Sequence, residues 1–180
     1  MQALLGWCYD QRMPLYVFSG GSSVTRGMEA VNGGVPLDLS VHLNRVLEFN
    51  ETDQTITVEP GISGPALEEA LNRAPERFGA QRRYTCGHFP QSFEYSTVGG
   101  WAVTRGAGQN STYYGKIEDI VIAQQMIPPA GVLRTGGAWV QRPPAHVHPE
   151  IDLGETSLGQ RPDHVFVLRF GEVPGGRLSA

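Results

Sequence analysis

The chain has 180 residues, which is the length of one domain with a single sizeable core. It contains 23 glycine and 13 proline residues without a Gly-X-Y period, so a collagen triple helix is excluded and a loop-rich α/β or α+β domain is favoured. The net charge of −4 argues against nucleic acid as the main partner, because a protein that neutralises phosphates needs a basic surface.

In the first third of the chain, the apolar pattern predicts a helix, two short strands and a hairpin. Residues 3–12 place apolar side chains at i, i+3 and i+4, which is typical of a helix with one buried face. The apolar run 15–18 predicts a buried strand, and a second strand is expected at 37–39 after a glycine-rich loop. Residues 45–50 and 55–59 flank a polar turn and predict a β-hairpin.

In the rest of the chain, the expected elements are separated by irregular stretches. Ser63 is expected to cap a helix that ends at Pro75. A short helix is predicted over 97–105 and a strand over 117–127. Beyond residue 136 only 165–170 has the pattern of a strand.

The first candidate site is the glycine-rich loop that directly follows the strand predicted at 15–18. Glycine adopts positive φ at no steric cost, so consecutive amide groups converge there into a concavity that binds phosphate oxygens. The loop matches neither the P-loop nor the Rossmann fingerprint, and taken alone it also fits an ordinary surface turn. Its residues are Val17, Phe18, Ser19, Gly20, Gly21, Ser22 and Ser23.

The second candidate site is the stretch from Gly87 to Trp101, followed by Thr104 to Gly108. It combines small hydroxyl residues, adjacent glycines and aromatic side chains, which suits the close approach of a large planar ligand. The alternative is a buried loop whose aromatic residues serve only as core. Two such segments together indicate a ligand that has both phosphates and a ring system.

The chain resembles the FAD-linked oxidases of the vanillyl-alcohol oxidase/PCMH flavoprotein superfamily, and within it the alkylglycerone-phosphate synthase-like branch. The resemblance covers residues 1–136. The motifs that carry it lie, in chain order, at 14–24, 38–40, 44–47, 58–62, 87–101 and 114–119.

The resemblance implies FAD as the cofactor, with its pyrophosphate held by backbone amides of the first loop. Ser19 replaces a glycine that is usual in the family. Ser22 stands where some relatives attach FAD through a histidine, so non-covalent FAD is expected. The residues implied to line the remaining FAD surface are Gln91, Ser92, Phe93, Glu94, Tyr95, Ser96, Thr97, Thr104, Arg105, Gly106 and Ala107.

The implied fold is α+β, of the PCMH-type FAD-binding kind. It consists of a small parallel βαβ unit and a mainly antiparallel sheet with flanking helices, and it is expected to be incomplete at both ends. Residues 1–136 are interpreted as a partial FAD-binding domain, and residues 137–180 as an atypical tail that is either frame-shifted or disordered.

The implied function is the FAD-binding portion of a flavin-dependent oxidoreductase. Such an enzyme passes a hydride from an organic substrate, a hydroxy acid or alcohol, to FAD. Two alternatives stay open, an alkyl transferase of the alkylglycerone-phosphate synthase type and an inactive fragment. Catalytic residues are unassigned, because the family carries the substrate groups on a cap domain that is not readable in this chain.

Other polar residues give weaker signals. His88 is either an acid or base near the flavin or a loop residue bonded to backbone, and without a visible partner it is left out of the catalytic set. His146 and His148 lack a third ligand, so no metal site is expected. Two cysteines and the lack of a signal peptide predict a cytoplasmic protein. No apolar run is long enough to cross a membrane, so no membrane contact is expected. The implied enzyme would act on a small-molecule substrate. Oligomerisation stays open.

Overall fold

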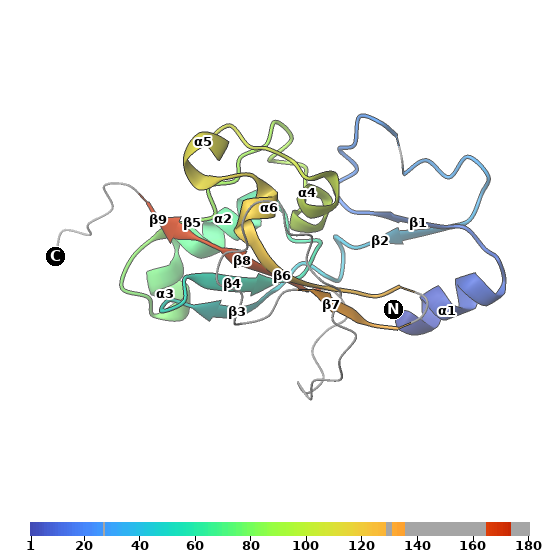
Figure 1. Cartoon of the computed structure of the whole chain (residues 1–180), viewed down its shortest axis with the longest axis horizontal. Coiled ribbons are helices and arrows are strands. Elements are labelled where there is room, and N and C mark those ends of the chain that lie inside the picture. The colour runs from blue at the N-terminus through green and yellow to red at the C-terminus, as the bar shows by residue number, and fades with distance from the viewer. Residues whose placement is uncertain (27, 129–130, 136–164, 174–180) are drawn as a thin grey trace.

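The computed structural model describes residues 1–26, 28–128, 131–135 and 165–173, and in these residues it has an α+β fold with three sheets (Figure 1). At one end lies a small unit of one helix, α1 (Gln2–Asp10), and two parallel strands, β1 (Leu15–Phe18) and β2 (Val35–Asp38). The predicted helix and both strands are confirmed, although α1 ends at Asp10 and β2 spans Val35–Asp38. The helix that a βαβ unit has between its two strands is not found in the described residues. The strands are joined by a loop, since the described residues between them contain no helix. The predicted buried face of α1 is reduced to Cys8, because Trp7 is half exposed.

The main sheet has five antiparallel strands in the order β3-β4-β8-β6-β7. The predicted hairpin is confirmed as β3 (Val46–Asn50) and β4 (Thr55–Val58). The strand predicted near the end of the chain is confirmed as β8 (Val165–Arg169), which lies between β4 and β6 (Val121–Met126). At the edge lies β7 (Leu133–Thr135).

The central strand β8 shows that part of the expected tail packs into the domain. Phe166 and Leu168 are buried and belong to the same core as Ile56 and Val58 of β4. The rest of the expected tail, residues 137–164 and 174–180, lies outside the described residues. The expectation that this tail is frame-shifted or disordered therefore concerns residues outside the described part of the chain.

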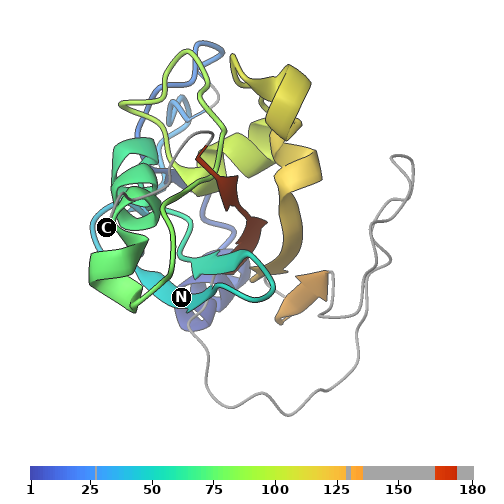
Figure 2. The same ribbon diagram turned by 90° about the vertical axis from the view of Figure 1, so that its left-hand side faces the viewer.

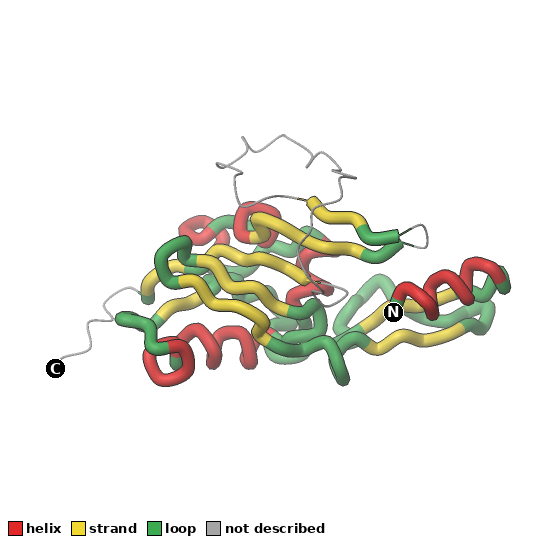
Figure 3. The backbone as a smooth tube through the Cα atoms, turned by 90° about the horizontal axis from the view of Figure 1, so that it is seen from below, coloured by secondary structure: helices red, strands yellow, loops and turns green. Residues whose placement is uncertain are grey.

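The core lies between the five-stranded sheet and the helices α2 (Gly64–Asn72), α4 (Val98–Thr104) and α6 (Ile117–Ile120), which cover one face of it (Figures 1 and 2). Viewed from below, the strands of this sheet lie side by side (Figure 3). A two-stranded sheet of β5 (Tyr84–Thr85) and β9 (Gly171–Glu172) lies beside α2, and α5 (Ser111–Tyr114) follows α4.

Two predicted boundaries are wrong for identifiable reasons. The helix predicted to stop at Pro75 already ends at Asn72, and Pro75 instead lies in the first turn of α3 (Ala74–Phe78), where its fixed φ suits a helix. The strand predicted over 117–127 begins as the helical turn α6. The Asp119 carboxylate accepts a hydrogen bond from the Lys116 amide (3.0 Å), which stabilises this turn.

The Ser63 cap is confirmed. Its hydroxyl accepts a hydrogen bond from the Ala66 amide (3.4 Å) at the start of α2.

The segment that leads from β4 to α2 is fixed by an ion pair between the buried Glu59 and the largely exposed Arg45. Glu59 is fully buried and accepts hydrogen bonds from the Arg45 backbone amide (2.8 Å) and from its guanidinium (2.8 and 3.1 Å). Burial alone would raise the pKa of Glu59, but the hydrogen bonds and the charge of Arg45 outweigh it and lower the pKa. The motif at 58–62 therefore holds the start of α4, since the Val98 and Gly99 amides donate to the carbonyls of Ile62 (3.1 Å) and Pro60 (2.8 Å).

Candidate cofactor site

The two glycine-rich segments singled out in the sequence meet in the folded chain. The hydroxyl oxygens of Ser19 and Thr97 are 2.5 Å apart. Gly20 lies so close to the second segment that a Cβ there would be 1.6 Å from the Tyr95 carbonyl oxygen and 3.2 Å from the Ser96 Cα. Only glycine fits at position 20, so the contact between the loops depends on it.

The first loop presents a row of unpaired backbone donors. The amide groups of Ser19, Gly20, Gly21, Ser22 and Ser23 donate to no acceptor among the residues that the structure describes. The last four of these residues are exposed, and Gly21 has a φ of 67°. Consecutive free amides around a residue with positive φ form an anion-binding concavity. This loop therefore fits the pyrophosphate of a dinucleotide.

The second segment is packed inward, in contrast to the first. The Trp101 indole N–H donates to the Ser96 hydroxyl (2.6 Å), and both Ser96 and Thr97 are buried. Phe93 lies against α2, where a Cβ at Gly64 would be 2.6 Å from its ring. Of the residues predicted here, Ser92 and Phe93 are half-buried, and Gln91, Glu94 and Tyr95 are exposed to solvent.

The third predicted stretch, Thr104 to Ala107, closes the end of α4. The Thr104 hydroxyl donates to the Gly100 carbonyl (2.8 Å), and Arg105 adopts a left-handed conformation (φ 53°) as the C-cap. The guanidinium of Arg105, one of the residues implied to line FAD, donates to the Glu118 carboxylate of α6 (2.7 Å). Gly106 is half-buried, and its amide and carbonyl are hydrogen-bonded to Trp101 and Ile117, so the exposed residues of this stretch are Thr104, Arg105 and Ala107.

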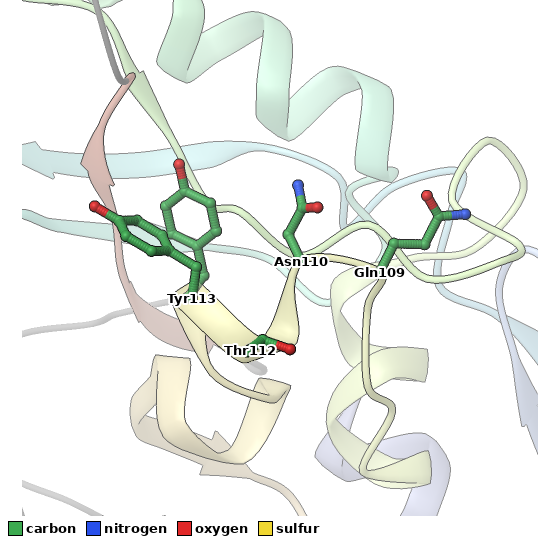
Figure 4. A pocket seen from close by; sticks show the side chains of 5 residues that line it. Gln109, Asn110, Thr112 and Tyr113 are labelled. Carbon is green, nitrogen blue, oxygen red and sulfur yellow. The ribbon is translucent and has the colours of Figure 1, made fainter.

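A hollow of about 510 Å³ lies beside the second and third stretches, and none of its lining residues is among the predicted site residues. The Tyr114 ring packs over Gly87, where a Cβ would be 2.2 Å from the ring, and Tyr113 meets it edge to face with centroids 4.8 Å apart. In the sequence, the adjacent tyrosines Tyr113 and Tyr114 before Gly115 were the signal that could have indicated this hollow. The lining residues, shown in Figure 4, are Gln109, Asn110, Thr112, Tyr113 and Tyr114.

His88 is buried beneath these stretches and its side chain is unpaired. It is 1% exposed, and neither ring nitrogen has a hydrogen-bond partner among the described residues. Its ring packs on Trp101 with centroids 4.7 Å apart. Burial lowers the pKa of His88 to about 4, so the imidazole is neutral at pH 7. The predicted bond from this side chain to backbone is not present in the described part of the chain.

Other potential sites give little. No three His, Cys, Asp or Glu residues among the described ones are grouped to hold a metal ion, and His146 and His148 lie outside those residues. None of the described helices is long and apolar enough to span a membrane. Cys8 and Cys86 are buried free thiols, and burial, with the nearby Glu68 charge, raises the pKa of Cys86 to about 12.

The fold combines a small parallel unit with an antiparallel sheet, and the free amides of the first loop suit a phosphate-bearing ligand. A family model described as an FAD binding domain matches residues 1–137. The chain therefore belongs to this family, whose members are flavoenzyme domains, and its cofactor is FAD.

Individual proteins agree with this assignment. The chain is 33% identical over 119 residues to alkyldihydroxyacetonephosphate synthase of Caenorhabditis elegans, which covers 64% of this chain and 18% of that protein. It is 32% identical over 143 residues to D-2-hydroxyglutarate dehydrogenase of Escherichia coli, covering 78% of this chain and 13% of that protein. The chain thus spans about a fifth or less of the length of these curated relatives.

Among solved structures, one of alkyldihydroxyacetonephosphate synthase superposes with a TM-score of 0.74 at 26% identity, covering 97% of this chain and 30% of that chain. The predicted PCMH-type FAD-binding fold is confirmed by this and related structures.

Proposed function

We propose that this chain is the FAD-binding portion of a flavin-dependent oxidoreductase that takes a hydride from a hydroxy acid or alcohol. The observation that carries the proposal is the row of five free amides from Ser19 to Ser23, which lies against the second glycine-rich segment. A pyrophosphate carries two negative charges, and converging amides stabilise them by hydrogen bonds without a basic side chain.

The chain's own residues bind and orient FAD in this proposal. The stretch from Val17 to Ser23 holds the pyrophosphate, and Gln91 to Thr97 with Thr104 to Ala107 lines the remaining cofactor surface. Ser96 and Thr97, whose side chains are buried, act by fixing the loops, whereas Gln91 and Tyr95 are exposed to the cofactor. FAD is held without a covalent bond, because Ser22 has no ring nitrogen to form one.

Bound FAD supplies a hydride acceptor at the flavin N5. Trp101 and His88 are buried beneath the backbone of the second and third stretches, and they would hold that backbone in place when FAD is bound. The substrate class is supported by the relative named for 2-hydroxyglutarate. Groups that bind the substrate and move its proton are not assigned to this chain.

A second candidate function is alkyl transfer of the alkylglycerone-phosphate synthase type, without net redox change. It is supported by the similarity to alkyldihydroxyacetonephosphate synthase in sequence and fold. Steady-state assays of a longer homologue distinguish the two, because the oxidoreductase reduces an electron acceptor whereas the transferase exchanges an acyl for an alkyl group. If such a homologue binds FAD and does neither, both candidates fail.

Three further expectations remain proposals. The FAD-binding domain is expected to cover residues 1–136, and we extend this proposal to strands β8 and β9, which pair with β4, β6 and β5. The location is cytoplasmic, which the free thiols of Cys8 and Cys86 support. The partner is a small organic substrate.

The direct test is to purify the 180-residue chain and measure flavin absorbance and the ratio of FAD to protein. We expect bound FAD that is released in full on denaturation. Flavin that stays with the denatured chain would contradict non-covalent binding, and a chain that takes up no added FAD would contradict the proposed function.

Two matched glycine variants locate the pyrophosphate. Gly21 and Gly33 lie in the same connection between β1 and β2, both are exposed, and their φ angles are 67° and 69°. Gly21→Leu and Gly33→Leu therefore carry similar backbone strain. We expect Gly21→Leu to weaken FAD binding at least about tenfold and Gly33→Leu to change it less than about threefold. Equal effects would contradict the placement.

A further inference from the structure

The hollow beside α5 is lined by residues that the proposed cofactor site does not use. Its volume of about 510 Å³ lies within the roughly 300–1,000 Å³ of small-molecule sites. None of the described residues that line it is acidic or basic. Such a lining offers no charged partner to a carboxylate, a phosphate or an ammonium group, so its chemistry suits a neutral ligand. The lining residues are Gln109, Asn110, Thr112, Tyr113 and Tyr114.

The backbone that carries these side chains is fixed by hydrogen bonds. The Gln109 amide donates to the Phe89 carbonyl (2.9 Å). The Tyr113 and Tyr114 amides both donate to the Asn110 carbonyl (3.0 Å). The hollow is therefore formed by the chain itself, which reduces the entropy that a ligand loses by ordering its site.

Tyr113 supplies an open aromatic surface. Its side chain is 79% exposed, and its ring meets the Tyr114 ring edge to face, with centroids 4.8 Å apart. A T-shaped pair covers at most one face of either ring, so at least one face of Tyr113 stays open. The face of an aromatic ring is electron-rich and attracts weakly positive C–H groups, such as those on the flat side of a sugar ring.

Gln109 and Asn110 supply groups that match hydroxyls. Both residues are exposed, and their side-chain amides have no hydrogen-bond partner among the described residues. Each amide has a carbonyl acceptor and an NH₂ donor, whereas each hydroxyl of a sugar both donates and accepts. Figure 4 shows the two amides projecting from the same side of this segment.

We propose that this hollow binds a neutral sugar ring. The C–H face of the sugar stacks on the Tyr113 ring, and neighbouring hydroxyls form hydrogen bonds with the amides of Gln109 and Asn110. This inference goes beyond the proposed function, because it does not depend on FAD and because its residues lie outside the stretches proposed to hold the cofactor.

The test is an NMR titration of the full ¹⁵N-labelled chain, without FAD, with methyl β-D-glucopyranoside. We expect the side-chain NH₂ signals of Gln109 and Asn110 to shift and to saturate in the millimolar range. The matched probe methyl β-D-glucopyranosiduronate carries a carboxylate in place of one CH₂OH group. It should bind more weakly, because its charge finds no cationic side chain in the hollow. The absence of a saturable shift with the neutral glycoside, or a uronate that binds as tightly or more tightly, would overturn the proposal.

Variants test the two kinds of contact. Tyr113→Ala should weaken binding of the glycoside at least about fivefold, whereas Tyr113→Phe keeps the ring and should stay within about twofold of the wild type. Asn110→Ala should weaken it about threefold at an unchanged melting temperature, since this side chain does not cap α5. The control is Tyr9→Ala in α1, where Tyr9 is similarly exposed (71%), and it should leave binding unchanged. Unchanged binding in Tyr113→Ala would contradict the stacking.

Adding saturating FAD separates this hollow from the cofactor site. We expect the affinity for the glycoside to stay within about twofold. If FAD displaces the glycoside, the hollow is part of the cofactor site, and this inference is overturned while the proposed function stands. If the chain binds the glycoside but takes up no FAD, the proposed function fails and this inference stands.

Discussion

The glycine loop at Ser19–Ser23 and the stretch from Gly87 to Gln109 look alike in sequence, yet their backbones are used in opposite ways. In the loop the amides are free and exposed. In the longer stretch, side chains and backbone pair with each other, as in the bond from Trp101 to Ser96 and that from the Gln109 amide to the Phe89 carbonyl. The loop at Ser19–Ser23 offers free amide donors to a ligand, whereas the longer stretch holds that loop in position through its packing against Gly20.

This difference predicts how substitutions divide. Changes in the longer stretch should reduce folding stability first and FAD binding as a consequence. Changes in the loop should reduce FAD binding with a smaller loss of stability.

The largest loss of stability is expected for Trp101→Ala. The Trp101 side chain is buried and packs on His88 and Phe93, so its removal leaves a cavity that should cost about 3–5 kcal/mol. Urea denaturation measures the free energy of unfolding. Val103→Ala, on the exposed side of the same helix, should change it by less than about 0.5 kcal/mol. Similar losses of unfolding free energy in Trp101→Ala and Val103→Ala would contradict the view that the buried side of this stretch determines stability.

The second effect concerns pH. The pKa of His88 falls from 6.5 to about 4 on folding, so the unfolded chain binds more protons than the folded one between these values. The contribution of His88 to stability is complete above pH 6.5, falls as pH decreases through this window, and below pH 4 is lower by about 3 kcal/mol.

The pH effect is measured as the difference in unfolding free energy between the wild type and His88→Phe. Burial raises the pKa of Glu68, so its contribution to stability declines as pH rises above 4.5, opposite to that of His88. Glu68 is present in both proteins, so its contribution cancels in this difference. A difference that does not change between pH 6.5 and 4 would show that His88 is not buried as described.

A smaller loss of stability, but a clear loss of FAD affinity, is expected for Gly20→Ala. The added Cβ would collide with the Tyr95 carbonyl, so the loop must move away from the second segment, at a cost of about 1–3 kcal/mol. FAD titration and urea denaturation measure the two effects. The control Gly6→Ala, in the open interior of α1, should instead stabilise by about 0.5–1 kcal/mol. If Gly20→Ala binds FAD normally, loop contact is not needed.

The smallest effect is expected for Ser19→Ala. It removes the hydroxyl that meets Thr97, and a hydrogen bond of this kind contributes about 0.5–1.5 kcal/mol. The backbone amide of residue 19 remains, so FAD affinity should change less than in Gly20→Ala. A larger loss of affinity in Ser19→Ala would assign the FAD contact to the side chain rather than to the backbone.

The sequence predicted most local elements, because strands such as β1 and the hairpin β3–β4 are specified by nearby residues. The sequence also drew attention to both loops, because glycine and serine are concentrated where the backbone is free, as at Ser19–Ser23, or closely packed, as around Ser96. It did not predict that β8 lies in the middle of the sheet, because strand order depends on contacts between residues far apart in the chain. For the same reason the pairing of Arg105 with Glu118 and the isolation of His88 emerged only from the folded structure.

The most direct measurement of the central claim is an NMR titration of the ¹⁵N-labelled chain with FAD. We predict that the amide signals of Ser19, Gly20, Gly21, Ser22 and Ser23 shift and saturate together with FAD, and move far less with riboflavin, which lacks the pyrophosphate. Saturable FAD binding that leaves these five amide signals unchanged would contradict the account.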